Sequence, residues 1–297
     1  MRINPQYIQG LVSAANQNSA NQQKFSTEIA TGVSVNNLSD NPSAAAQDFL
    51  LRSEISSNDN FVQTASGVTG ALQVTDTALG SVVTQITQAI SLATEGNNGT
   101  LNASDRSSIA NQLTGVRSEI LSLANTSYQG QFVFAGSQSS TQPFSMNAGT
   151  TPATVVYSGD SLQSTIQSPS GQSFPLNVPG SQIFGSGSTG ILATLSNLIA
   201  SFSAGNADIP NTTALNTDLQ GISQQRVIID NSISGLQSAS TYTQNQTTQM
   251  QAVQDSLIQA DTAQVATQLS TSETQGTALL DTIAGLEQQP TLFTVLK

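Results

Sequence analysis

Apolar side chains recur at one spacing through residues 51–93, the longest regular stretch of the chain. Stepping alternately by four and three residues meets an apolar side chain at ten of thirteen positions. These positions are Leu51, Ile55, Asn58, Val62, Ala65, Thr69, Leu72, Asp76, Leu79, Val83, Ile86, Ile90 and Ala93. A period of about 3.5 residues is typical of a coiled-coil-like helix, which at about 1.5 Å per residue would be roughly 60 Å long. The pattern favours a helical rod, although a long core helix of a globular bundle needs the same spacing.

The same spacing predicts the partners of this helix. The cluster "EGNNGT" at residues 95–100 ends it, and apolar residues resume between Ile109 and Leu123. Two helices joined by so short a loop fold back antiparallel. The pattern returns in "ILATLSNLIASFS" (191–203) and again from Leu215 to Leu236, where Arg226 interrupts it. We therefore expect an outgoing rod segment at residues 41–130 and a returning segment at residues 191–250.

Residues 131–190 have a different character. Short β-branched or aromatic runs, among them "QFVFAG", "ATVVYSG" and the strand-like "SQIF", are divided by Gly, Pro and Ser. We predict a small β-rich domain inserted into a mainly helical protein. The segment "GSGSTG" at residues 185–190 is expected to be a flexible linker into the next helix.

The two ends of the chain, residues 1–40 and 251–297, are predicted to be helices with weaker apolar faces. Their seams include the polar or small residues Asn18 and Gln22 at one end, and Ser272 and Gly276 at the other. Such seams bury little apolar surface, so we expect them to order only when neighbours in an assembly cover them. The predicted assembly residues are Ile8, Leu11, Ala15, Phe25, Ile29, Val265, Leu269, Leu279, Ile283, Leu286, Leu292 and Phe293.

A polar stretch, "SVNNLSDNPSAAA" at residues 34–46, separates the first terminal helix from the rod. Its candidate helix cap consists of Ser39, Asp40, Asn41 and Pro42. Proline steers the residue before it away from the helical conformation, which suits Asn41 as an N-cap, and Pro42 fits the first helical position. We predict that a helix starts here and that the stretch marks the junction between the assembly core and the rod.

Composition argues against most enzymatic chemistry. The chain has no Cys, His or Trp and seven Lys and Arg residues in total. Ser-His and Cys-His catalysis are therefore excluded, and the commonest metal ligands are missing. The acidic residues lack the spacing of a calcium-binding loop, so we predict neither a cofactor nor a metal. A net charge of −11 would repel nucleic acid and anionic membranes.

Three further observations narrow the class of protein. Residues 1–30 hold no apolar core of about 7–15 residues, and no run approaches about 18 apolar residues, so neither a cleaved signal peptide nor a membrane span is predicted. The segment "GSGSTG" matches a dinucleotide-binding fingerprint, but Asp208 lies in a turn sequence rather than at the end of a second parallel strand. The outer helix faces are rich in Gln, Asn, Ser and Thr, which favours a polymer subunit, although a compositional bias of the lineage explains them equally well.

Several segments resemble the bacterial flagellin family. The block "QQKFSTEIATGVSVNNLSDNPSAAAQDFLLRSEI" resembles the family's succession of helix, small turn, Asx-Pro segment and long helix, and Asn60 is typical of the next block. The segments "LANTSYQGQFVFAG", "VYSGDS" and "NVPGSQIFG" resemble the hook-associated branch that joins the hook to the filament. The C-terminal "ADTAQVATQLSTSETQGTALLDTIAGLEQQPTLFTVL" resembles the terminal helix that the family shares. The chain departs from the family pattern at Gly32–Val33, at Asn41 and at Lys297.

The resemblance implies a structural protein of the extracellular flagellum, not an enzyme, exported without a cleaved signal peptide. Its terminal helices would pair in the inner core of a tube, the rod would surround them, and the β-rich domain would face outward. The implied partners are further copies in a homo-oligomeric ring, the preceding hook-associated protein, flagellin, and an export chaperone on the C-terminal helix. Three alternatives remain: a flagellin that forms the filament itself, a nucleotide-binding enzyme at "GSGSTG", and a soluble coiled-coil adaptor.

Overall fold

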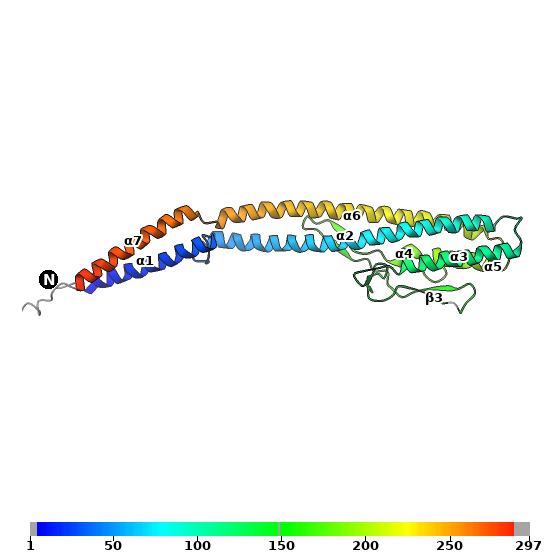
Figure 1. Cartoon of the computed structure of the whole chain (residues 1–297), viewed down its shortest axis with the longest axis horizontal. Coiled ribbons are helices and arrows are strands. Elements are labelled where there is room, and N and C mark those ends of the chain that lie inside the picture. The colour runs from blue at the N-terminus through cyan, green and yellow to red at the C-terminus, as the bar shows by residue number, and fades with distance from the viewer. Residues whose placement is uncertain (1–4, 148, 288–297) are drawn as a thin grey trace, which may run out of the picture. The chain divides into compact units, whose positions relative to one another are not determined.

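The computed structural model describes residues 5–147 and 149–287, which fall into two compact units. The terminal unit combines the two ends of the chain, up to Ser56 and from Gln246 on, and the central unit spans residues 57–245. Two long helices contribute to both units, α2 (Pro42–Gly96) and α6 (Ile209–Ile258). The predicted mainly helical class is confirmed (Figure 1).

The terminal unit contains an antiparallel pair of helices, α1 (Pro5–Thr31) and α7 (Thr262–Glu287), which lie side by side in Figure 1. The two connections that lead into this pair are hydrogen-bonded to each other. Ser34 N donates to Ile258 O at 2.6 Å, and Ala260 N donates to Gly32 O at 2.9 Å. The predicted terminal helices therefore exist and pair within a single chain.

The seam predicted from the spacing of apolar residues lies on α2. All thirteen of its positions are buried or half-buried, including the polar Asn58, Thr69 and Asp76. In the central unit the apolar members of this seam share a core with Ile222, Ile229 and Leu236 of α6, among others. The spacing could predict this face because each step of three or four residues returns to the same side of a helix.

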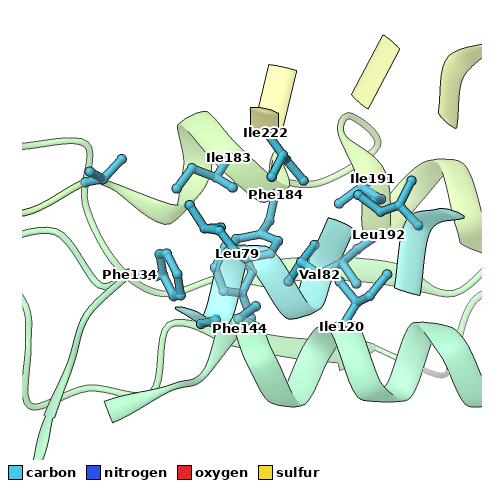
Figure 2. Close-up of a cluster of buried hydrophobic side chains, with 14 of the residues drawn as sticks. Leu79, Val82, Ile120, Phe134, Phe144, Ile183, Phe184, Ile191, Leu192 and Ile222 are labelled. Carbon is cyan, nitrogen blue, oxygen red and sulfur yellow. The ribbon is translucent and has the colours of Figure 1, made fainter. Parts of the chain in front are cut away.

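Two shorter helices complete the helical part of the central unit, α3 (Ala103–Ala124) and α5 (Ile191–Ser203), which pack against each other. Asn102 caps α3 by accepting from Asp105 N at 2.9 Å. The positions of α3 predicted from the spacing are buried, except for Leu123, which is half-buried. Figure 2 shows Leu79 and Val82 of α2, Ile120 of α3, and Ile191 and Leu192 of α5 in one cluster with side chains of the segment that links α3 to α5.

That segment contains short strands in three two-stranded antiparallel sheets, counted within the described residues. The pairs are β1 (Ser127–Tyr128) with β2 (Gln131–Phe132), β3 (Phe144–Asn147) with β4 (Thr154–Tyr157), and β5 (Thr165–Gln167) with β6 (Ser173–Pro175). The Phe184 ring meets those of Phe134 and Phe144 edge-on, with centroids 5.1 and 5.4 Å apart (Figure 2). The predicted β-rich segment is present, and it shares one core with the helices.

Two predictions within this segment are wrong. The strand-like "SQIF" belongs to a helix, α4 (Gly180–Phe184), because Gly180, Ile183 and Phe184 are all buried and this spacing suits one face of a helix rather than an alternating strand. Residues 185–190 form a tight turn instead of a flexible linker. A Cβ at Gly185 would collide with the backbone oxygen of Thr189, and one at Gly190 with that of Phe184, so neither position has room for a side chain.

Candidate assembly surface

The predicted assembly residues that the structure describes lie on the paired helices α1 and α7. Leu11, Ala15 and Phe25 are half-buried on α1, whereas Ile29 is exposed. On α7, Val265 is buried, and the half-buried residues of the prediction are Leu269, Leu279 and Ile283. Ile8 and Leu286 belong to the two helices, and Leu292 and Phe293 lie outside the described residues. Most of the described side chains of this group are therefore at least half-buried within a single chain.

The middle of this contact is polar. Asn18 and Ser272 are buried, and they are hydrogen-bonded to each other. Gln22 of α1 also reaches α7, and Gly276 of α7 faces both amides of α1. The apolar spacing located these four positions but gave no sign that they contact one another.

The predicted cap at residues 39–42 is the start of α2. Asn41 Oδ1 accepts from Ala44 N at 3.1 Å, and Pro42 is the first helical residue. Asp40 Oδ2 accepts from the backbone N–H groups of Asn37 and Asn36 at 2.8 and 3.2 Å. These bonds, Asn37 foremost, together with the Lys24 ammonium 3.6 Å from the other carboxylate oxygen, lower the pKa of Asp40. Because Lys24 lies on α1, its ion pair ties the polar stretch back to the first terminal helix.

The terminal unit also exposes large apolar side chains that the spacing did not single out. Phe49 and Leu50 of α2 are 72% and 66% exposed, and Leu280 of α7 is 63% exposed. The described terminal unit has eight such side chains and the larger central unit has six. Those of the terminal unit are Tyr7, Val12, Ile29, Leu38, Phe49, Leu50, Val253 and Leu280. The run Phe49–Leu50–Leu51 indicates exposed apolar side chains, because one helix face cannot bury three consecutive apolar residues.

The described residues of the central unit hold no arrangement that suggests catalysis. Asp208, the candidate acid of a nucleotide site, caps α6: it accepts from Asn211 N at 3.1 Å, and its other carboxylate oxygen accepts from Ser201 Oγ at 2.7 Å. No three carboxylates among the described residues come together as metal ligands. A cavity of about 610 Å³ between α2 and the β1–β2 hairpin is lined by uncharged residues, including Thr64 and Tyr128. None of the helices described here has the length and apolar character needed to cross a membrane.

Comparison with known proteins finds a family match for the N-terminal helices of the chain. Residues 6–139 match the family model of the bacterial flagellin N-terminal helical region. The matched residues comprise most of α1, all of α2 and α3, and the β1–β2 hairpin. The predicted resemblance to the flagellin family is confirmed there.

Two curated relatives carry the name flagellar hook-associated protein 3. The protein of Salmonella typhimurium is 32% identical over 189 residues, which is 63% of this chain and 57% of the relative. The protein of Escherichia coli K12 is 34% identical over 131 residues, which is 44% of this chain and 41% of the relative. The chain thus spans about half the length of the curated relatives it matches.

A solved structure shows the same fold. It is that of a Vibrio parahaemolyticus protein described as a flagellar hook-associated protein. It superposes with a TM-score of 0.62 at 21% identity, over 74% of this chain and all of that one. This chain and that protein therefore share a fold.

Proposed function

We propose that this chain is a structural subunit of the bacterial flagellum that joins the hook to the filament. The observation that carries the proposal is the apolar surface of the terminal unit, with Phe49, Leu50 and Leu280 each more than three-fifths exposed. Large apolar side chains left exposed in a folded unit favour a contact with other subunits. The names of the two relatives, flagellar hook-associated protein 3, support the same place in the cell.

The proposed arrangement assigns a role to each part of the chain. Residues 1–40 and 251–297 contact neighbouring copies in the inner core of a tube, residues 41–130 and 191–250 surround that core, and residues 131–190 face outward. The partners are further copies in a ring, the preceding hook-associated protein on one side and flagellin on the other. The outer faces of the long helices are rich in Gln, Asn, Ser and Thr, which suits this role because packing uncharged side chains desolvates no charge.

We further propose that the chain leaves the cell through the flagellar export channel, without a cleaved leader, and that an export chaperone covers the C-terminal helix beforehand. The exposed Leu280 and half-buried Leu279 and Ile283 on α7 support a need for such cover. The protein acts by contact alone and carries out no reaction.

The alternative within the same class is a flagellin that builds the whole filament, since the matched region is named for flagellin. The two functions differ in where the chain lies on a flagellum and in how many copies are present. Antibody against residues 131–190, coupled to gold, should label isolated flagella at one point, between the hook and the filament. A strain that lacks the chain is the control for specificity and should show no label. Label along the filament would contradict the junction role and support the flagellin alternative.

A further inference from the structure

We propose that a buried polar contact between α1 and α7, together with the hydrogen-bonded connections at one end of the pair, determines the register in which these helices pair. Asn18 and Ser272, its buried members, are 8% and 5% exposed. Asn18 Nδ2 donates to Ser272 O at 2.8 Å, and Ser272 Oγ donates to Asn18 Oδ1 at 2.6 Å. Gln22 Nε2 donates to the same Ser272 carbonyl at 3.0 Å. The inference goes beyond the proposed function, because it concerns the pairing of two helices within one chain.

Gly276 makes this contact possible. It lies four residues after Ser272 on α7, and side chains four residues apart share one face of a helix and lean toward its N-terminus. A Cβ at position 276 would lie 2.7 Å from Asn18 Nδ2 and 3.0 Å from Gln22 Nε2. The missing side chain therefore leaves the Ser272 carbonyl open to both amides of α1.

The backbone bonds from Ser34 N to Ile258 O and from Ala260 N to Gly32 O hold the register where the two connections meet. Along the helices themselves, apolar contacts alone would leave it open. Leu279 follows Ser272 by seven residues, and Phe25 follows Asn18 by seven, so sliding one helix by this amount still aligns seam with seam. The slide places Asn18 opposite Leu279, and Phe25 opposite Ser272. The opposite slide brings Asn18 against Val265. In either slipped register a buried amide loses its hydrogen-bond partners, which penalises the slipped pairing and spares the native one.

The absence of Cys from the chain allows the register to be measured with labels at chosen positions. Spin labels on cysteines introduced at the exposed Ser26 and Gln264 report the distance between α1 and α7 in the full chain by dipolar spectroscopy. We expect one narrow distance distribution for the parent. In Asn18→Leu/Ser272→Leu we expect a second population, from pairs slid along the helix axes by about 10 Å, which is seven residues at about 1.5 Å each.

A matched control separates the loss of the polar contact from the gain of apolar surface. Gln17→Leu/Thr271→Leu adds the same two side chains one position away, at exposed sites on the same helices. This control should keep the distribution of the parent. The proposal is overturned if Asn18→Leu/Ser272→Leu keeps it as well.

A second pair of variants retains every polar side chain. Gly276→Ala places a methyl group between the amides and the carbonyl, whereas Gly285→Ala, also on α7, meets no atom within 4 Å. Both changes raise helix propensity. We expect amide hydrogen exchange in α1 and α7 to become several-fold faster in Gly276→Ala and to stay equal or slow down in Gly285→Ala. Equal protection in the two variants would contradict the proposal. Both readouts use the isolated chain, so they are independent of its place in a flagellum.

Discussion

A single guanidinium joins three segments at one end of the central unit. Arg106 donates from Nε to Gly96 O at 3.0 Å and from Nη2 to Asn98 O at 3.0 Å. Its Nη1 donates to Leu101 O at 3.0 Å and to Gly205 O at 3.2 Å. Gly96 ends α2, and Gly205 follows the end of α5, where helices leave carbonyl groups without partners and a positive charge is favoured. The fixed fork of arginine donors suits carbonyls that arrive from several directions.

We predict that Arg106→Lys lowers the free energy of unfolding of the central unit by about 2 kcal/mol, because one ammonium cannot reach four carbonyl oxygens. Urea unfolding followed by circular dichroism measures the change. Arg52→Lys is the control: this guanidinium is 61% exposed and meets Asp48 at 2.8 Å on the same helix, so its loss should cost less than about 0.5 kcal/mol. Equal effects of the two substitutions would show that Arg106 does not hold the three segments together.

At the scale of elements, the terminal helices differ from those of the central unit in how much of each is buried. Among the described side chains of α1, Asn18 and Glu28 are buried, and among those of α7, Val265 and Ser272 are buried. By contrast, α5 buries every residue from 191 to 196. Helices with few buried apolar contacts open at lower free energy than the core of the same protein.

This difference predicts the order of proteolysis. In the isolated chain, a protease of broad specificity should cut first within residues 1–40 and 255–297, while α3 and α5 stay intact. Mass spectrometry of fragments at early times gives the order. Digestion in concentrated urea is the control, since it shows whether α3 and α5 contain cleavable bonds once unfolded. Early cuts in α5 would contradict the expected order of stability.

The apolar spacing predicted the long helices because a helical seam repeats over many turns, so single polar positions do not hide it. Arg226 interrupts the apolar spacing of α6, and Asp76 interrupts that of α2. The structure pairs them, with Arg226 Nε 2.7 Å from one Asp76 oxygen and Nη2 3.0 Å from the other. A spacing rule treats each helix separately, so it cannot show that two polar positions compensate each other across a contact.

Because a spacing rule treats each helix separately, it also could not predict the polar contact between α1 and α7. The polar positions Asn18 and Ser272 are far apart in sequence, and their hydrogen bonds follow from the register of α1 against α7. The sequence of α4 is strand-like, because a run of five residues is too short for periodicity to separate a helix from a strand. Helices of many turns were thus predictable, whereas contacts between elements and short elements required the structure.

At the scale of the whole molecule, charge and apolar surface have opposite effects on association. The chain has a net charge of −11. The described basic side chains already have partners: Lys24, Arg52 and Arg226 contact carboxylates, Arg106 contacts carbonyl groups, and Arg117 donates to Ser196 Oγ. Copies of the chain therefore repel one another by charge, and salt screens that repulsion. Attraction between copies has to come from uncharged contacts, and the exposed apolar side chains of the terminal unit can supply them.

Leu280→Asp tests that surface with little disturbance of the fold. The side chain is 63% exposed, so a carboxylate there should leave the helicity and unfolding of the isolated chain unchanged. In a subunit contact the same carboxylate would be buried without a partner, at a cost of several kcal/mol. We therefore expect cells that carry this variant as their sole copy to incorporate much less of it into flagella and to lose motility.

Leu162→Asp provides the matched control, because this leucine is 60% exposed but lies in the central unit, between β4 and β5. It should be incorporated like the parent chain. Immunoblots of purified flagella measure incorporation, and blots of the culture medium show whether each variant is still exported. If Leu280→Asp is exported and incorporated as well as Leu162→Asp, then α7 does not contact other subunits through Leu280. A variant that stays inside the cell would instead place the defect before assembly, at the export step proposed for this helix.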